Sequence, residues 1–376
     1  MSDAEGGMPA DADGVPDDAA ETNPVRPDDG EPARPEDGES TRPDDEESAG
    51  PDDGEPTGPD DGEPTGPDDG PTQVDSPDYH SVNHTAAQTC GWTKNALVGE
   101  GRCYKNVWYG IESHRCIQMT PVVRCNERCV FCWRDHGGHA YELEGVEWDD
   151  PDAVADASID LQRRLLSGFG GNDAVPRERF EDAMEPRHVA ISLDGEPTLY
   201  PYLPELLEAF HDRGLTTFLV SNGTRPAVLR ECEPTQLYVS VDAPERHTFD
   251  RVVKPMEDDA WERLVESMDV LAGKEDTRTV LRTTLIDGEN MRDPDWYAAF
   301  YERADPDFVE LKAYMHVGHS RGRLDRSSMP DHEAVVDFAE RVGEHMPEHT
   351  ELESVPASRV ALLSKTADTW VPELRS

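Results

Sequence analysis

The chain has 376 residues, a formal net charge of −46 and seven cysteines. No stretch approaches the roughly 18 apolar residues of a membrane-spanning helix, and the N-terminus has no apolar signal segment. The composition therefore excludes a membrane-spanning protein and predicts a cytoplasmic one, in which cysteines serve metal or redox chemistry more often than structural disulfides.

Residues 1 to about 80 form an acidic tail with 27 acids and three arginines. An eight-residue unit recurs in it as RPDDGEPA, RPEDGEST, RPDDEESA and twice as GPDDGEPT. A short repeat of acids and turn formers buries no core, so we predict disorder for 1–80 and one folded domain at 81–376. An interaction segment is the alternative for the tail.

The folded part is also acidic, with a net charge of −22, and the whole chain has 29 Arg but only six Lys. An acid-rich surface stays solvated where salt screens its self-repulsion, so we interpret the composition as halophilic. Net charge therefore does not exclude a nucleic-acid partner.

Three cysteines, Cys90, Cys103 and Cys116, are spaced 13 and 13 residues apart in an N-terminal extension at 81–120. Such wide spacing does not itself specify a metal. Because a second cysteine motif follows closely, we expect a second cluster with one open iron, against the alternative of buried thiols. Lys105 lies between two of these cysteines, and as a buried amine it would be a nucleophile toward a carbonyl. A solvent-facing lysine is the alternative.

The second motif, Cys125-Asn-Glu-Arg-Cys129-Val-Phe-Cys132, follows a β-branched run at 116–123. Three thiolates on one short loop can bind three irons of a cubane cluster and leave the fourth iron open for a cofactor. This C-x3-C-x2-C spacing resembles the signature of the radical S-adenosylmethionine (SAM) superfamily. A zinc site with a distant fourth ligand is the alternative. Cys232 is left over, and we expect it to pack as a small apolar residue.

Short β-branched runs then alternate with helical patterns, which predicts an α/β fold with a parallel sheet. The expected strands are 116–123, 188–193, 216–220, 236–241, 279–285 and 308–314, and the expected helices are about 151–166, 203–213, 226–232, 258–272, 293–303 and 331–345. A nearly closed barrel and an open doubly wound sheet both place the site at the carboxyl ends of the strands.

Polar residues follow several of these strands, including the segment Lys312 to His316. In radical SAM enzymes the second strand ends in a Gly-Gly-Glu-like turn that binds the amino group of SAM; here the turn is Asp194-Gly195-Glu196. Gly195 lets the backbone pass close to a ligand, and Glu196 can accept from an ammonium. The residues expected to contact the SAM carboxylate and ribose are Ser221, Asn222, Ser240 and Asp242.

From about Cys90 onward the chain resembles the archaeal tRNA 4-demethylwyosine synthases. The resemblance includes both cysteine sets, Ser192-Leu-Asp-Gly-Glu-Pro-Thr-Leu-Tyr-Pro201, Leu219-Val-Ser-Asn-Gly-Thr-Arg-Pro226 and Leu311-Lys-Ala-Tyr-Met-His-Val-Gly-His-Ser-Arg321. It implies a radical SAM partial (β/α)6 barrel of the TIM type, two [4Fe–4S] clusters and SAM. It leaves the acidic tail outside, and Asp194 departs from the superfamily's Gly-Gly-Glu pattern.

The resemblance further implies a carbon–carbon lyase-type reaction, in which pyruvate condenses with N1-methylguanosine beside the anticodon of tRNA-Phe. Pyruvate would be held near the second cluster or as a Schiff base on Lys105, with electrons from an external flavodoxin- or ferredoxin-type donor to a monomeric enzyme. Candidate tRNA contacts are Arg134, His136, His139, Arg321 and Arg323. Two alternatives stay open: a two-cluster radical SAM enzyme that modifies a peptide, and a non-catalytic zinc-binding protein.

Overall fold

Six parallel strands form the centre of the fold. The structure is a computed structural model that describes residues 79–136, 141 and 143–374, so the acidic tail and His139 lie outside the described residues. The parallel strands are β3 (Cys116–Thr120), β4 (His188–Ile191), β5 (Thr216–Ser221), β6 (Gln236–Ser240), β7 (Arg278–Leu285) and β8 (Phe308–Ala313). They pair in the order of the chain, so each crossover leads to the next strand along.

Four further strands extend both edges of this sheet. The order is β1-β2-β3-β4-β5-β6-β7-β8-β10-β9, with antiparallel pairing outside β3 and β8. The added strands are β1 (Tyr79–Val82), β2 (Thr85–Gln88), β9 (Glu351–Val355) and β10 (Val360–Ser364). The core is therefore a partial barrel with open edges, and not a doubly wound sheet, whose strand order would reverse direction.

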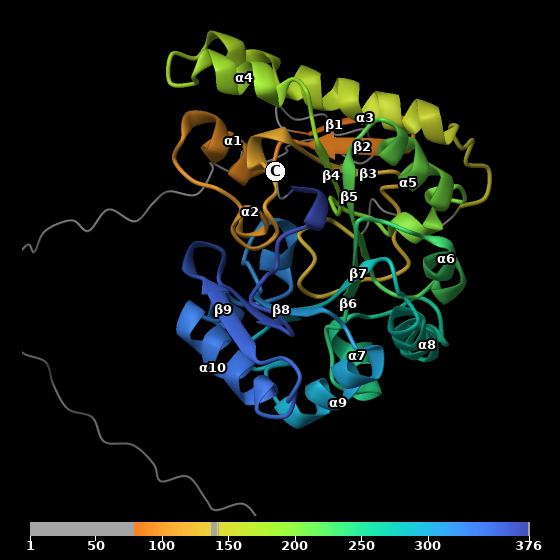
Figure 1. Cartoon of the computed structure of the whole chain (residues 1–376). Coiled ribbons are helices and arrows are strands. Elements are labelled where there is room, and N and C mark those ends of the chain that lie inside the picture. Colours follow the sequence, from red (N-terminus) through yellow and green to blue (C-terminus); the bar gives the residue numbers. More distant parts are fainter. Residues whose placement is uncertain (1–78, 137–140, 142, 375–376) are drawn as a thin grey trace, which may run out of the picture. The chain divides into compact units, whose positions relative to one another are not determined.

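Six helices cover the outer face of the sheet (Figure 1). They are α3 (Pro151–Leu166), α5 (Leu203–Asp212), α6 (Pro226–Glu231), α8 (Ala260–Ala272), α9 (Pro294–Ala304) and α10 (His332–Gly343). Helix α3 begins with Pro151 after the cap Asp150, whose side chain accepts a hydrogen bond from Asp152 N. This cap and a proline in the first turn are typical helix starts.

Successive side chains of each strand pack into two different hydrophobic cores, one under the outer helices and one in the barrel interior. Leu219, Val239, Leu281 and Val309 face the helices, whereas their preceding neighbours, Phe218, Tyr238, Val280 and Phe308, face the interior. This alternation follows from the two-residue period of a β-strand. The short helix α2 (Tyr104–Tyr109) fills part of the interior, where Tyr104, Trp108 and Tyr109 pack on these four side chains.

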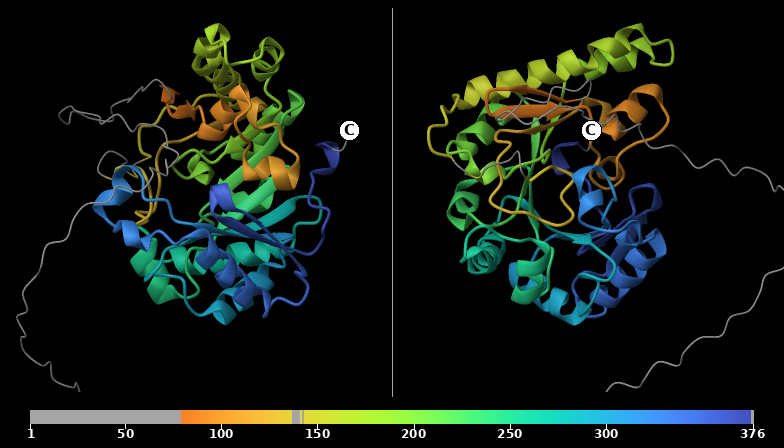
Figure 2. Two further views of the ribbon diagram at one scale, coloured as in Figure 1. Left: turned by 90° about the vertical axis from the view of Figure 1, so that its left-hand side faces the viewer. Right: turned by 180° about the vertical axis from the view of Figure 1, so that it is seen from behind.

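The two cysteine sets are separated along β3. Cys116 is its first residue, and Cys125 follows its last residue by five positions. In the left view of Figure 2 the loop after β3, in gold, and helix α2, in orange, lie at opposite ends of the strands. The first-motif cysteines therefore lie at the carboxyl ends of the strands, where a barrel carries its active site.

All six predicted strands and six predicted helices are present, with boundaries shifted by three residues at most. Strand β1 begins at Tyr79, next to the boundary predicted at about residue 80. Among the described residues, no helix is long and apolar enough to cross a membrane. Elements that the pattern did not predict include α1 (Gly91–Val98), α2, α4 (Arg177–Ala183) and α7 (Arg246–Val252).

Candidate active site

The loop with Cys125, Cys129 and Cys132 is fixed by main-chain hydrogen bonds to the end of α7 and the two residues after it. Arg128 N donates to Val253 O (3.2 Å) and Lys254 O (3.1 Å), and Val130 N donates to Val252 O (2.9 Å). The three thiols lie close enough to act on one another: burial raises the pKa of the Cys129 thiol, and Glu127, Cys125 and Cys132 raise it further. The loop thus gathers its three cysteines in one place, as the motif predicted.

The carboxylate of Glu196 connects three segments of the site. Its Oε1 accepts from Ser221 Oγ (2.8 Å), and its Oε2 accepts from Asn222 N (2.7 Å). Asn222 Nδ2 in turn donates to Oδ1 of Asn126 in the cysteine loop (2.9 Å). Glu196, Ser221 and Asn222 are therefore brought together as predicted, but much of their hydrogen-bonding capacity orders the site itself.

The left-handed backbone of Gly195, with φ +68°, lets this turn touch the segment before Cys125. A Cβ at this position would collide with Val122 O and lie 2.9 Å from Arg124 O. Glu196 N donates to Arg124 O (2.8 Å), so the contact between the two segments is an ordered one.

We expect Gly195→Ala to lower the free energy of unfolding by about 2–4 kcal/mol, through backbone strain and a clash with main-chain atoms. Gly214→Ala is the matched control, because Gly214 also has a left-handed φ (+74°), but a Cβ added there would meet no atom within 4 Å. It should lose only about 1–2 kcal/mol. Urea denaturation of both variants measures the difference, and equal losses would contradict the close approach.

Asp194, which departs from the Gly-Gly-Glu pattern, pairs with a residue of the cysteine loop. Its Oδ2 lies 2.8 Å from Arg134 Nη2 and accepts from Tyr79 Oη (3.3 Å). Burial raises the pKa of Asp194 to about 6, although Arg134 acts in the opposite direction. The aspartate thus ties the turn after β4 to the end of the cysteine motif.

Three buried carboxyl groups, those of Glu127, Glu196 and Asp242, lie near one another at the cysteine loop, and the last two act on Glu127. Burial and then the charges of Glu196 and Asp242 raise the pKa of Glu127 well above its usual value. Glu127 Oε1 is buried and has no hydrogen-bond partner among the described residues. SAM carries an ammonium and a sulfonium, so a buried acceptor and a group of carboxylates fit it chemically.

Asp242 and Ser240 lie at the carboxyl end of β6. Asp242 Oδ1 accepts from Thr284 N (2.6 Å), and burial raises the pKa of this carboxyl to about 6. Ser240 is half-buried and pairs in register with Arg282 of β7. Both residues therefore lie at the end of the predicted strand, close to the predicted mouth of the barrel.

Cys90, Cys103 and Cys116 also gather in one place. Burial raises the pKa of Cys103 to about 11, with Cys90 as the next cause, and burial raises that of Cys116 to about 12, with Cys103 and Cys90 adding to it. Ser113 holds two of the segments together: its Oγ accepts from Cys103 N (3.0 Å), and its main-chain O accepts from Thr93 of α1 (3.1 Å).

Lys105 is buried, with 6 % of its surface exposed, so the interpretation as a solvent-facing lysine is wrong. Its Nζ lies 4.3 Å from the centre of the Tyr238 ring and 5.4 Å from that of Phe218. Burial lowers its pKa, and Arg282 acts in the same direction, whereas Glu310 and Cys103 oppose the shift. The amine therefore faces the interior from helix α2.

A network of charged and phenolic groups surrounds this amine. Glu310 accepts from Tyr104 Oη (3.0 Å) and Tyr109 Oη (2.8 Å), which anchors helix α2 to strand β8. Arg282 pairs in register with Glu310 on the neighbouring strand. Lys312, two residues after Glu310, donates to Ser358 O (2.7 Å), and burial lowers its pKa to about 8.

In the described part of the chain, no three His, Cys, Asp or Glu side chains meet closely enough to hold a single metal ion. One zinc ion needs its donors at about 2.0–2.3 Å from a common centre. In a cubane cluster each thiolate binds a different iron. Cysteines that are gathered but do not converge on one point are compatible with cluster ligation.

All three arginines considered as tRNA contacts make hydrogen bonds or ion pairs within the protein. Arg323 donates to Val130 O (3.1 Å), Cys132 O and Arg134 O (3.2 Å), and Arg134 pairs with Asp194. Arg321 donates to His316 O (3.2 Å). The pKa of His136 is lowered to about 4 by burial and by Arg323. The segment after β8 therefore packs closely on the cysteine loop.

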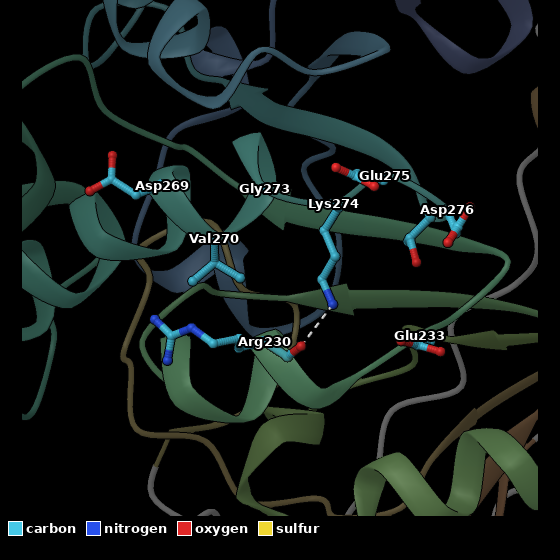
Figure 3. A pocket seen from close by; sticks show the side chains of 9 residues that line it. Arg230, Glu233, Asp269, Val270, Gly273, Lys274, Glu275 and Asp276 are labelled. Carbon is cyan, nitrogen blue, oxygen red and sulfur yellow. Dashed lines mark hydrogen bonds between the residues drawn. The ribbon is translucent and has the colours of Figure 1, made fainter.

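Two surface hollows lie away from both cysteine sets. The first, of about 420 Å³, is lined by Arg230, Glu233, Asp269 and residues 273–277, which precede β6 and β7 (Figure 3). Lys274 points across it and donates to Arg230 O (3.0 Å). The second, of about 620 Å³, lies between the start of α3 and the length of α5. The first hollow is at the amino ends of the strands, the edge opposite a barrel active site.

Cys232 is buried in the outer core, as predicted. Four residues of the site were not predicted from the sequence: Asn126, Glu127, Arg282 and Glu310. A signal for the last two was present, because charged residues inside a predicted buried strand need partners.

Two family models match the chain: "Radical SAM superfamily" over residues 119–300 and "Wyosine base formation" over residues 303–365. A tRNA 4-demethylwyosine synthase of Pyrococcus abyssi is 46% identical over 289 residues, which span 75% of this chain and 84% of the relative. One of Methanocaldococcus jannaschii is 42% identical over 302 residues, spanning 79% and 96%. A solved structure of TYW1 with a lysine–pyruvate adduct is 41% identical, covers 76% of this chain and 92% of its own, and has a TM-score of 0.70.

Proposed function

The chain belongs to the family of S-adenosyl-L-methionine-dependent tRNA 4-demethylwyosine synthases, and we propose from this that it condenses pyruvate with N1-methylguanosine next to the anticodon of tRNA-Phe. The observation that carries the proposal is that Lys105 is buried in the barrel interior beside Cys103 and Cys116. The first cysteine motif lies at the mouth of the same barrel. Because the chain belongs to this family, it is neither a peptide-modifying radical SAM enzyme nor a non-catalytic zinc-binding protein.

As a radical SAM enzyme, the chain uses SAM and a [4Fe–4S] cluster. We assign this cluster to Cys125, Cys129 and Cys132, and the contacts of SAM to Gly195, Glu196, Ser221, Asn222, Ser240 and Asp242. When bound, the cluster would supply the electron for reductive cleavage of SAM, and this chemistry would provide a radical able to remove a hydrogen from the unactivated N1-methyl group. Glu127, with its buried acceptor, adds to the carboxylates that suit the cationic cofactor.

A second [4Fe–4S] cluster is assigned to Cys90, Cys103 and Cys116. Its support is their common position, in which Cys90 raises the pKa of Cys103 and both of these thiols raise that of Cys116, together with the hydrogen bond from Cys103 N to Ser113 Oγ. These three cysteines would leave one iron open toward the interior that contains Lys105.

Lys105 is assigned as the amine that forms a Schiff base with pyruvate. The bond between Nζ and the keto carbon forms, and the carbonyl oxygen leaves as water with two protons from the amine. The related structure with a lysine–pyruvate adduct supports this role, as do the burial of Lys105 and the aromatic rings that shield its amine.

SAM cleavage consumes one electron, which neither tRNA nor pyruvate provides, so an external donor of the flavodoxin or ferredoxin type is part of the proposal. We propose that the enzyme acts as a monomer. The tRNA must present a splayed anticodon-loop base to the mouth of the barrel.

The test is incubation of the anaerobically reconstituted protein with SAM, dithionite and tRNA-Phe that carries N1-methylguanosine. Pyruvate labelled at carbons 2 and 3 should give a tricyclic nucleoside with two labelled carbons, and pyruvate labelled at carbon 1 should give an unlabelled one. Mass spectrometry of digested tRNA measures both, with tRNA lacking the methyl group as control. Absence of product from methylated tRNA, with SAM cleavage intact, would contradict the proposed substrate.

A further inference from the structure

We propose that Lys312 binds the carboxylate of pyruvate while Lys105 forms the imine with its keto carbon, which makes Lys312 a second, substrate-specifying amine of this site. The inference rests on the proposed function and deepens it, because it names the group that distinguishes pyruvate from other ketones.

Lys312 lies on the interior face of β8, two residues beyond the buried Glu310. Its side chain is half-buried, and its Nζ donates to Ser358 O at 2.7 Å. An ammonium has three donors, so this bond to a neutral carbonyl uses one of them. The remaining donors are the kind that a carboxylate accepts with a charge-assisted hydrogen bond.

Lys312 and Lys105 share their surroundings. The same three groups, Glu310, Arg282 and Cys103, act electrostatically on both amines. The Nζ of Lys312 also lies 5.9 Å from the centre of the Tyr104 ring, and Tyr104 directly precedes Lys105 on helix α2. Both lysines therefore flank the place where Tyr104 meets strand β8.

The chemistry of pyruvate requires a cation at this place. An imine on Lys105 carries the carboxylate of pyruvate into a buried interior, and an unpaired carboxylate there is costly. The oxygens of Glu310 already accept from two tyrosines, and its charge acts on Arg282 as well. Lys312 donates its hydrogen bond to the neutral carbonyl of Ser358, and that contact does not neutralise its positive charge. This charge therefore suits the incoming carboxylate of pyruvate.

The experiment is borohydride trapping on the cluster-loaded enzyme, with the modified fraction of Lys105 measured by peptide mass spectrometry. Two ketones are compared: pyruvate, and acetone, which has the same methyl and carbonyl carbons without the carboxylate. Lys312→Gln should raise the pyruvate concentration for half-maximal trapping by about 10- to 100-fold and change acetone trapping by less than about two-fold. Lys312→Arg should keep most of the preference for pyruvate.

Lys274→Gln is the matched control, because Lys274 also donates to main-chain carbonyls, Arg230 O and Cys232 O, but at the opposite edge of the sheet. It should trap both ketones as the wild type does. Equal losses of pyruvate and acetone trapping in Lys312→Gln, or no loss of either, would overturn the role of Lys312 alone. A wild-type enzyme that traps no ketone on Lys105 would overturn the Schiff-base proposal and this inference with it.

Discussion

Cys125→Ala should abolish SAM cleavage and remove about half of the iron, whereas Cys103→Ala should remove about half of the iron and leave SAM cleavage measurable. The wild type should hold about eight irons per chain, the content of two [4Fe–4S] clusters. The different outcomes follow from the separation of the two sets, since β3 lies between Cys116 and Cys125. The measurement is iron and sulfide content after anaerobic purification, together with 5′-deoxyadenosine formation.

Cys232→Ala is the control for both cysteine variants, because Cys232 is buried in the outer core far along the sequence from either set. Its iron content should equal that of the wild type. About four irons in the wild type, all lost with Cys125→Ala and none with Cys103→Ala, would contradict the second cluster and leave the first assignment standing. Zinc in place of iron would contradict both assignments.

The cysteine motif and the six parallel strands could be predicted because both depend on local pattern. The C-x3-C-x2-C spacing lies within eight residues, and each buried strand is a short β-branched run. Two of the four antiparallel strands, β9 and β2, were not predicted, for equally local reasons. Strand β9, Glu-Leu-Glu-Ser-Val, is mostly exposed and has no apolar face, and β2, Thr-Ala-Ala-Gln, contains residues of low strand propensity.

The partners inside the site could not be predicted, because they come from segments far apart in the chain. Glu310 is bonded to Tyr104 and Tyr109, and no spacing rule connects a strand near the C-terminus with a helix near the start of the domain. Asp194 seemed a departure from a binding pattern, but its partner, Arg134, lies on the cysteine loop. The sequence showed which residues were chemically unusual, and the fold decided which of them meet.

The interior of the barrel holds an acidic and a basic group of side chains. Glu127, Glu196 and Asp242 lie near the first cysteine set, and burial raises the pKa of each carboxyl. Lys105, Arg282 and Lys312 lie near Glu310 and the second set, and burial lowers the pKa of both lysines. Strand register places Arg282 level with Ser240, and Lys312 level with Thr284, whose amide donates to Asp242. The two groups are therefore neighbours in one interior, as the proposed condensation requires.

Lys105→Arg should lower product formation by on the order of 1,000-fold while 5′-deoxyadenosine is still formed. Arginine keeps the positive charge near Glu310 and the stacking on Tyr238, but its guanidinium cannot form an imine with pyruvate. The loss therefore isolates the nucleophilic role of the amine from its charge. Lys274→Arg, on the surface hollow of Figure 3, is the matched control and should keep wild-type activity. Product formation by Lys105→Arg at more than about a tenth of the wild-type rate would mean that pyruvate reacts without an imine on this residue, and the assignment of Lys105 would then be wrong even if both clusters are present.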